Sequence, residues 1–232
     1  MTPQRLALFD LDHTLLPLDS DYQWADFLAR TGRAGDPAEA RRRNDHLMDR
    51  YNQGELTAEQ AAEFMLGLLA AHTPYELANW HEAFMTDVIR PHITPQAIQT
   101  VEQHLAAGDL CAIVTATNGF VTAPIARAFG IEHLIATDAE YRNGRYTGRI
   151  QGTPSFKEGK VVRVNQWLAG MNLTLANFSE SFFYSDSIND IPLLEVVTHP
   201  VAANPSPALR EIAQTRGWKV LDLFEHLEDA KS

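Results

Sequence analysis

The sequence predicts an α/β protein built on a doubly wound parallel sheet, and three observations support this prediction. Short apolar runs of strand length alternate with helical segments, which is typical of a parallel sheet with helices on both faces. Several of these runs end in Asp, Thr or Ser-Asp rather than in ordinary turn residues. Residues 18–92 carry helix signals and no convincing strand. We therefore expect a Rossmann-like core with an inserted all-helical segment and a small β-hairpin.

The first strand is expected at residues 6–9, where an apolar run stops at Asp10-Leu11-Asp12. The helices that follow carry start or stop signals of their own, which are capping residues, an early proline or a closing glycine. One helix over 21–30 is closed by Gly32, and the others begin at Asp36-Pro37, Thr57-Ala58-Glu59-Gln60 and Thr73-Pro74-Tyr75-Glu76.

After the insertion the chain alternates between strands and helices. Asn143-Gly144 lies between strand-like flanks, which is a strong hairpin signal because both residues tolerate positive φ. Further strands are expected at 110–114, 181–184, 201–203 and 219–221, and further helices at 95–107, 120–129, 161–168, 191–197 and 206–216. The expected domains are a core of 1–16 and 94–232, a helical cap of 17–93 and a hairpin insertion at 139–152.

Composition excludes several classes of function. The 232 residues include 19 Lys and Arg against 30 Asp and Glu, giving a formal net charge of −11. This charge argues against nucleic-acid or anionic-membrane binding, because both require a basic surface. There is no signal peptide and no run long enough to span a membrane, so we expect a cytoplasmic protein. The single cysteine, Cys111, lies in an apolar run and is expected to be buried in a strand.

Asp10 and Asp12 follow the first strand two residues apart, so in an extended chain their side chains point to the same face. Two carboxylates this close remain ionised when a cation shares them. A site of a few carboxylates and backbone carbonyls suits Mg²⁺, which often binds together with a substrate phosphate. The alternative is an ordinary strand-end turn, where Asp is common.

Other chemically useful residues also occur at strand ends or helix starts. Thr115 ends a second strand, Lys160 begins a helix, and Asp186 ends a third strand. Together with Asp10 and Asp12 they supply what phosphoryl transfer through an aspartate requires: a nucleophile, a cation site, an ammonium group, a hydroxyl and a second carboxylate for proton transfer. Each residue also has an ordinary interpretation, as a helix cap, a surface charge or a strand-end turn.

Four segments resemble the signature motifs of the haloacid dehalogenase superfamily. They are Phe9-Asp10-Leu11-Asp12-His13-Thr14-Leu15-Leu16, Ile113-Val114-Thr115, Gly159-Lys160-Val161 and Tyr184-Ser185-Asp186-Ser187-Ile188-Asn189-Asp190. The helical insertion and the hairpin are similar to subfamily IB, which contains phosphoserine phosphatases and histidinol-phosphate phosphatases. The second aspartate argues against a dehalogenase.

The resemblance implies a role for each motif residue. Asp10 would be the nucleophile and a Mg²⁺ ligand, and Asp12 the general acid and base, which binds the metal through its backbone carbonyl. Asp186 would be the remaining metal ligand. The phosphoryl oxygens would be held by Thr115, Asn118 and Lys160, and the supporting residues would be Thr14, Asn189 and Asp190. Lys157 remains an alternative to Lys160, and His13, which replaces a usual small residue, has no assigned role.

The start of the insertion is expected to contact the leaving group. Asp19, Asp21 and Trp24 predict an acidic, aromatic-edged pocket that favours a cation through charge pairing and cation–π contact. The alternative is an ordinary helix N-terminus capped by Asp. Phosphoserine would need a cation for its carboxylate, which the run 41–43 of three arginines offers unless it is a solvated face.

The predicted function is Mg²⁺-dependent hydrolysis of a small phosphorylated metabolite through an aspartyl-phosphate. Histidinol phosphate is the first candidate, because it carries an amine and an imidazole but no carboxylate. Phosphoserine hydrolysis and phosphomutase activity are the enzymatic alternatives, and a catalytically silent binding module on the same fold is the alternative from another class. The sequence makes no prediction of oligomeric state.

Overall fold

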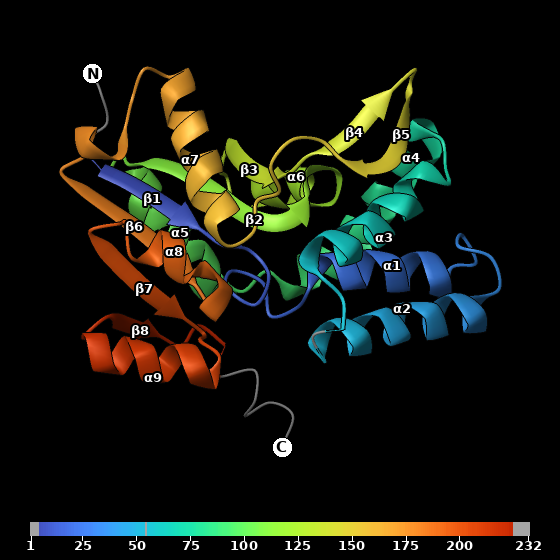
Figure 1. Cartoon of the computed structure of the whole chain (residues 1–232), viewed down its shortest axis with the longest axis horizontal. Helices are drawn as coiled ribbons and strands as arrows, with labels where there is room; N and C mark the ends of the chain where they lie inside the picture. Colours follow the sequence, from blue (N-terminus) through green and yellow to red (C-terminus); the bar gives the residue numbers. More distant parts are fainter. Residues whose placement is uncertain (1–4, 54, 225–232) are drawn as a thin grey trace.

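The computed structural model describes residues 5–53 and 55–224 and contains a six-stranded parallel sheet, which lies on the left in Figure 1. Its spatial order is β3-β2-β1-β6-β7-β8. Because β1 pairs with β2 on one side and β6 on the other, the chain order reverses beside β1, where sheets of this kind bind ligands. The strands are β1 (Arg5–Phe9), β2 (Leu110–Asn118), β3 (His133–Thr137), β6 (Glu180–Ser185), β7 (His199–Ala203) and β8 (Lys219–Leu221).

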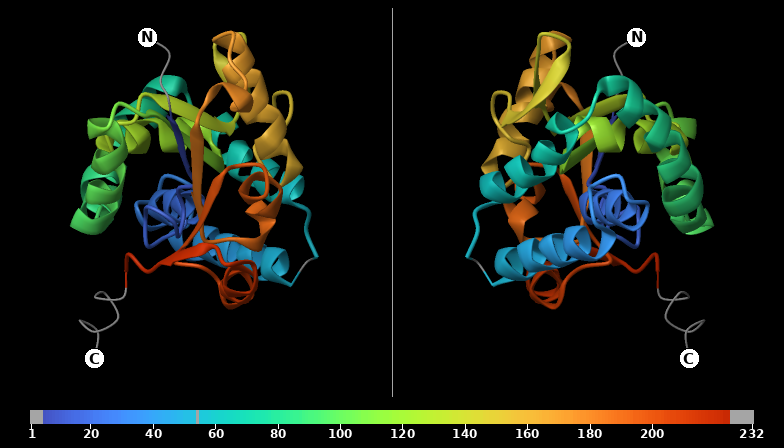
Figure 2. Two further views of the ribbon diagram at one scale, coloured as in Figure 1. Left: turned by 90° about the vertical axis from the view of Figure 1, so that its left-hand side faces the viewer. Right: turned by 90° about the vertical axis from the view of Figure 1, so that its right-hand side faces the viewer.

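Helices cover both faces of the sheet (Figure 2). Ala7 and Phe9 of β1 belong to the core beneath α5 and α6, whereas Leu6 and Leu8 belong to the core beneath α7, α8 and α9. All four side chains are fully buried, which explains the unbroken apolar run. The predicted doubly wound fold is therefore confirmed. The helices are α5 (Pro95–Ala106), α6 (Gly119–Ala128), α7 (Glu158–Gly170), α8 (Ile191–Leu194) and α9 (Pro207–Arg216).

The segment between β1 and α5 is helical, as expected. Capping boxes start two of its helices, at Thr57 with Gln60 and at Thr73 with Glu76. The last helix runs into a π-helical turn and a short 3₁₀ turn, which the sequence did not indicate. The elements are α1 (Ser20–Arg30), α2 (Pro37–Asn52), α3 (Ala58–Ala70), α4 (Pro74–Phe84), η1 (Met85–Ile89) and η2 (Arg90–His92).

A small antiparallel hairpin, β4 (Ala139–Arg142) and β5 (Arg145–Ile150), lies beside α3 (Figure 1). Asn143 and Gly144 have φ values of 51° and 78°, so the Asn-Gly signal predicted this turn correctly. Gly148 of β5 faces the inserted helices, since a Cβ there would lie 3.5 Å from the Gly67 Cα. The hairpin therefore packs closely against α3.

Three local predictions differ from the structure. The sequence assigned no strand to β3, a five-residue edge strand whose first two residues are only half-buried. Strand β2 continues four residues beyond Val114, with an irregularity in its pairing before Asn118, although its last residues are polar. Helix α8 ends at Leu194 rather than at Val197. Cys111 is buried in β2 as predicted.

The 3₁₀ turns η3 (Leu175–Asn177) and η4 (Ile188–Asp190) complete the described elements. No helix among residues 5–53 and 55–224 is both long and apolar enough to cross a membrane.

Candidate active site

The ends of β1, β2 and β6 meet at one cavity of about 620 Å³. Asp10, Thr115 and Asp186 line it, and Lys160 joins them from the first turn of α7. The parallel arrangement explains the meeting, because the carboxyl ends of adjacent parallel strands share one edge of the sheet. We call this space the larger cavity, because it shares part of its wall with a smaller cavity of about 130 Å³. It is also lined by Asp12, His13, Pro17, Leu18, Asp19, Tyr22, Gln23, Met48, Ala116, Thr117, Phe156, Ser187, Asn189 and Asp190.

Asp10 is held by contacts on its backbone and on both carboxylate oxygens. Its N–H donates to the Tyr184 carbonyl at 2.9 Å, which ties the end of β1 to β6. Lys160 Nζ donates to Asp10 Oδ1 at 2.8 Å, and the Thr14 hydroxyl lies 3.1 Å from Oδ2. These contacts fix the direction of the Asp10 carboxylate, as a nucleophile requires.

Thr14 links Asp10 to Asp186. Its fully buried hydroxyl lies 3.2 Å from Asp186 Oδ1 and accepts a hydrogen bond from the Asp186 N–H at 3.1 Å. Burial, together with the nearby carboxylates of Asp10 and Asp190, raises the pKa of Asp186 to about 8. Crowded carboxylates of this kind are stabilised by a cation.

This donor set fits Mg²⁺ through two carboxylates rather than three. Within residues 5–53 and 55–224, no group of three or more His, Cys, Asp and Glu side chains is arranged as a metal site. Mg²⁺ needs no such group, because it keeps several waters and uses one or two carboxylates together with a substrate phosphate. Asp10 and Asp186 could supply those carboxylates. Both oxygens of the Asp12 side chain accept hydrogen bonds from protein groups.

Lys160 is nearly fully buried between two carboxylates. Its ammonium donates to Asp10 Oδ1 and, at 2.6 Å, to Asp190 Oδ2, which also accepts from the Ser185 hydroxyl at 2.7 Å. Burial alone would lower the pKa of Lys160, but the two carboxylates outweigh it and raise the pKa. Lys157 is exposed, with its ammonium 5.2 Å from the centre of the Phe156 ring. Lys160 is therefore the lysine that faces the site.

Gly159 allows Lys160 to reach this place. A Cβ on Gly159 would lie 2.1 Å from the Pro154 carbonyl oxygen, far inside van der Waals contact. The chain folds back tightly here, because the Gly159 N–H also donates to the Phe156 carbonyl at 2.9 Å. A glycine before the lysine is thus required by the close approach of the loop to α7.

Asp12 has both carboxylate oxygens engaged. Oδ1 accepts from the Ser20 N–H at 2.8 Å, and Oδ2 accepts from the Thr117 hydroxyl at 2.7 Å. Burial, with a further contribution from the charge of Asp19, raises the pKa of Asp12 to about 7. A carboxyl group with a pKa near neutrality is suited to both donating and accepting a proton.

Sequence reasoning did not single out Thr117. The predicted strand stopped at Val114, so the residues after it were treated as a polar strand end. Because β2 continues in an extended conformation, Thr115 and Thr117 point to the same side, and Ala116 between them is exposed. Period-two alternation continued past Val114 would have placed Thr117 beside Thr115.

Two predicted site residues have other roles in the structure. Asn118 does not line the larger cavity. Its side-chain NH₂ donates to Asp21 Oδ1 at 2.8 Å, and its side-chain oxygen accepts from the Val121 N–H as the cap of α6.

Trp24 is fully buried among Phe27, His81, Phe84 and Phe120, so it does not present a face to a substrate. Phosphate binding by Asn118 and cation–π contact by Trp24 stay predictions, and in this structure the two side chains make the contacts given above.

Asp19 and Asp21 lie at a smaller cavity of about 130 Å³ between the inserted helices and the core. Asp19 also caps α1 by accepting from the Tyr22 N–H, as the helix N-terminus interpretation expects, and its contact with a leaving group stays a prediction. Burial, and then the charges of Asp19 and Asp12, raise the pKa of Asp21 well above its ordinary value. The smaller cavity shares Asp19, Met48, Ala116, Thr117 and Phe156 with the larger one.

Among the described residues that line the two cavities, Lys160 is the single lysine or arginine. Arg41 instead pairs with Asp26 at 3.0 Å, and Arg43 donates to the Ala34 carbonyl at 3.2 Å. His13 lines the larger cavity with an exposed side chain and a φ of 58°.

Comparisons with known proteins identify the family and the fold. The haloacid dehalogenase-like hydrolase family matches residues 7–195. A histidinol-phosphatase from Neisseria meningitidis serogroup C (strain 8013) is 43% identical over 220 residues, covering 94% of this chain and 99% of that protein. A crystal structure of a protein of unknown function from Bordetella pertussis Tohama I is 82% identical, with a TM-score of 0.95 over 96% of this chain and 100% of that chain.

A substrate-bound phosphoserine phosphatase structure has the same fold, with a TM-score of 0.66 and 19% identity over 98% of both chains. The family match spans all four motifs and the strand ends that carry them. The chain therefore belongs to the haloacid dehalogenase-like hydrolase family, as an enzyme of the phosphoric monoester hydrolase class.

Proposed function

We propose that the protein is a Mg²⁺-dependent phosphatase that cleaves a small phosphorylated metabolite through an aspartyl-phosphate on Asp10. The observation that carries this proposal is the placement of the Asp10 carboxylate between Lys160 and the Thr14–Asp186 pair, at the point where the strand order reverses. A fixed carboxylate beside an ammonium group is suited to attack on a phosphate ester.

The proposed reaction uses these residues in two steps. A carboxylate oxygen of Asp10 attacks phosphorus, and the bond to the leaving oxygen breaks while Asp12 gives that oxygen its proton. Water then attacks phosphorus, Asp12 takes a proton from it, and inorganic phosphate leaves as the Asp10 carboxylate is restored. Thr115 and Lys160 would bind the phosphoryl oxygens, and Asn189 and Asp190 would support the site.

Mg²⁺ would be held by the carboxylates of Asp10 and Asp186 and by the Asp12 backbone carbonyl. Bound there, it would neutralise charge on the phosphoryl oxygens. Thr14 keeps Asp10 and Asp186 at a separation that one hydroxyl can bridge, so both carboxylates are prepared for the same ion. Asp12 keeps its side chain for proton transfer.

We propose histidinol phosphate as the first substrate to test. The relative that is 43% identical is named a histidinol-phosphatase. The smaller cavity combines Asp19 and Asp21 with apolar walls that include Met48, Met65 and Phe156, which suits an amine or imidazole better than a carboxylate. Phosphoserine would bring a carboxylate to a place where no described lysine or arginine other than Lys160 lines the cavities.

We further propose that residues 17–93 act as a cap over the core of 1–16 and 94–232, with the hairpin at 139–152 beside it. The smaller cavity supports this division, because its wall combines the inserted residues Leu47 and Met65 with the core residues Thr137 and Pro154. A phosphomutase would use the same aspartate but return the phosphoryl group to a sugar. Release of inorganic phosphate in proportion to substrate consumed distinguishes a phosphatase from that alternative.

Asp10 is the proposed nucleophile, and its substitution tests the mechanism. Asp10→Asn keeps the shape of the side chain but removes the anionic nucleophile, so hydrolysis of histidinol phosphate in the presence of Mg²⁺ should fall by more than about 10³-fold. Phosphate release and circular dichroism measure activity and fold. Asp36→Asn, which alters an exposed carboxylate that accepts from the Glu39 N–H, serves as the matched control and should remain active.

Two outcomes would contradict the proposal. Retained activity in Asp10→Asn would exclude the aspartyl-phosphate route. A clear preference of the unmodified protein for phosphoserine over histidinol phosphate would exclude the acidic subsite for a cationic leaving group, while leaving the phosphatase assignment intact.

A further inference from the structure

Thr117 lies beside the general acid and base, and none of the four motifs contains it. We propose that Thr117 is a positioning residue, which holds the Asp12 carboxyl group for proton transfer to the leaving oxygen. The inference rests on the proposed function, because it requires Asp12 to exchange a proton with substrate and water.

The contact itself is short and buried. The Thr117 hydroxyl donates to Asp12 Oδ2 at 2.7 Å, and the side chain is 6% exposed. The Thr117 N–H donates to the Thr115 hydroxyl oxygen at 3.2 Å. One stretch of β2 therefore supplies both a hydroxyl for the phosphoryl group and a hydroxyl for the acid, in fixed relation to each other.

A second element constrains the same carboxyl group from the opposite oxygen. The Ser20 N–H, at the start of α1, donates to Asp12 Oδ1 at 2.8 Å. Two donors on two oxygens restrict rotation of the carboxyl plane, which a single hydrogen bond would allow. Since the Ser20 donor is a backbone group, Thr117 is the partner that a side-chain substitution can remove.

The location of Thr117 matches the path of the leaving group. Thr117 lines both cavities, whereas Asp12 lines the larger one alone. A substrate with its phosphoryl group at Asp10 and its other end in the smaller cavity would have its bridging oxygen near this boundary. The Thr117 hydroxyl is therefore placed to orient Asp12 toward the atom that must receive a proton.

A hydroxyl can stay bonded to Asp12 in both protonation states. It donates to the carboxylate, and after rotation about its C–O bond it accepts from the carboxylic acid. In the first step an Asp10 oxygen bonds to phosphorus and the phosphorus–oxygen bond to the leaving group breaks. Its electron pair stays on the leaving oxygen, which the Asp12 proton neutralises. In the second step a water oxygen bonds to phosphorus and gives a proton to Asp12, while the bond between phosphorus and Asp10 breaks and its electron pair returns to the carboxylate.

The dependence on the leaving group distinguishes positioning from a merely structural role. An alkyl phosphate such as histidinol phosphate or β-glycerophosphate has a poor leaving group and needs the proton. The p-nitrophenolate ion leaves without one. Loss of the Thr117 hydroxyl should therefore slow the first turnover of an alkyl phosphate. It should leave the rate of p-nitrophenol release from p-nitrophenyl phosphate in the first turnover nearly unchanged.

The experiment compares Thr117→Val and Thr117→Ser with the unmodified protein in single turnovers with Mg²⁺. Thr117→Val should reduce the alkyl phosphate rate by about 10- to 100-fold, within the range that general acid catalysis supplies. The p-nitrophenyl phosphate burst should change by less than about 3-fold, because no proton is needed there. Thr117→Ser keeps the hydroxyl and should restore most of the alkyl phosphate rate.

Thr122→Val is the matched control. Thr122 is fully buried and its hydroxyl donates to the Asn118 carbonyl at 2.9 Å, without contact with Asp12. It should affect both substrates equally. If Thr117→Val does not fold, Thr117→Ala provides the same comparison.

Two results would overturn the inference: an equal loss on both substrates in Thr117→Val, or an unchanged rate on the alkyl phosphate. Failure of the proposed function would look different. In that case Asp10→Asn would retain activity, or the unmodified protein would release no phosphate from either substrate.

Discussion

Single residues decide how the motifs meet at the larger cavity. The Thr14 hydroxyl lies within hydrogen-bond reach of both Asp10 and Asp186, so one side chain sets the separation of the two carboxylates. Gly159 lets Lys160 leave the loop and enter the buried site. Thr14 acts through one hydroxyl group and Gly159 through the absence of a side chain. Substitutions that add or remove one methyl or hydroxyl group can therefore test both roles.

The glycine before Lys160 gives a prediction at this scale. Gly159→Ala would bring a Cβ to 2.1 Å from the Pro154 carbonyl oxygen, so the loop or the start of α7 must move. We expect a loss of about 2–4 kcal/mol in the free energy of unfolding, as for other strained or overpacked sites. Activity should fall as well, because the Lys160 ammonium moves with the backbone. Urea unfolding and phosphate release measure the two effects.

Gly170 of the same helix provides the control. A Cβ there meets nothing within 4 Å, and alanine is the better helix former. Gly170→Ala should therefore leave activity unchanged and stability equal or slightly higher. Equal stability of Gly159→Ala and Gly170→Ala would show that the loop adapts without strain.

The site residues differ in how far the sequence could predict them. Asp10, Thr115 and Asp186 follow apolar runs, and the geometry of parallel strands alone brings such strand ends to one edge. Asn118 and Trp24 could not be assigned in this way. The local sequence of Asn118 is compatible with contact to a substrate or with capping of α6, and that of Trp24 with contact to a substrate or with burial in the core. Which direction each side chain takes depends on packing between α1, α4 and α6, which are distant in sequence.

At the scale of elements, a buried polar network connects the amino-terminal half of the sheet to α5. His104 of α5 contacts Asp109 Oδ2 at 2.6 Å and the Tyr184 hydroxyl at 2.8 Å. Asp109 also accepts two hydrogen bonds from Arg5, at 2.8 and 2.9 Å. The Tyr184 ring stacks on Phe9, whose ring centre lies 4.9 Å away. The residues that precede Asp10 and Ser185 are thereby held in register with α5.

Asp109 gives the prediction for this network. Burial alone would raise its pKa, but hydrogen bonds from Arg5 and His104 outweigh burial and lower it. A lowered pKa means that the ionised form stabilises the fold above the ordinary value of about 3.8, and that this contribution is lost as pH falls through the lower folded value. Asp109→Asn should cost about 1–3 kcal/mol at pH 7, allowing for the partial exposure of Arg5.

Urea unfolding at several pH values measures this effect. The difference between the unmodified protein and Asp109→Asn should be constant from pH 7 to about pH 5 and should narrow at lower pH, because the unmodified protein then loses its ionised carboxylate. Asp138→Asn alters a carboxylate that is 53% exposed and paired with Arg163, and it should cost less than about 1 kcal/mol. A difference that widens toward acid would contradict the assignment.

The elements were easier to predict than their ends. Capping boxes and the Asn-Gly turn are local signals, and the structure places helices and a hairpin where they occur. β3 carries no such signal: it is a short edge strand, and its pairing with β2 is what defines it. The polar end of β2 is extended for the same reason, since Asn118 pairs with Thr137 of that neighbouring strand.

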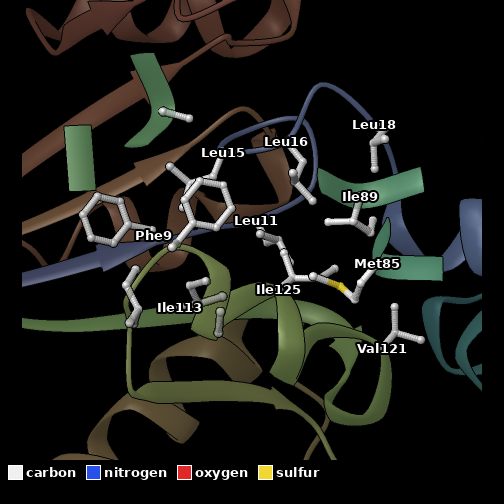
Figure 3. Packing of buried hydrophobic residues seen from close by; sticks show 14 of the residues in the cluster. Phe9, Leu11, Leu15, Leu16, Leu18, Met85, Ile89, Ile113, Val121 and Ile125 are labelled. Carbon is white, nitrogen blue, oxygen red and sulfur yellow. The ribbon is translucent and has the colours of Figure 1, made fainter. Parts of the chain in front are cut away.

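At the scale of the whole molecule, one hydrophobic core continues from the sheet into the helical insertion. Phe9, Leu11 and Ile113 belong to the same buried cluster as Met85 and Ile89 of η1, as Figure 3 shows. Trp24 of α1 belongs to it as well and packs against Phe84 and Phe120. The insertion and the core should therefore unfold together, because neither buries this cluster without the other.

A substitution at Trp24 tests both the shared core and the contact of this residue with substrate. Trp24→Phe leaves a space among Phe27, His81, Phe84 and Phe120, so we expect a loss of about 2 kcal/mol in the free energy of unfolding with a single transition. The transitions followed by circular dichroism and by tryptophan fluorescence should coincide. Trp80→Phe, at a half-buried tryptophan of α4, is the matched control and should cost less.

A buried Trp24 also has a consequence for substrate selection. Because its ring faces the shared core and lines neither cavity, the ratio of kcat/KM for histidinol phosphate to that for phosphoserine should stay within about 2-fold in Trp24→Phe. Both rates are measured well below the midpoint of thermal unfolding, so that lost stability does not appear as lost activity. A ratio that shifts toward phosphoserine would show that Trp24 contributes to the selection of the substrate. Two separate unfolding transitions would instead show that the insertion folds independently of the sheet.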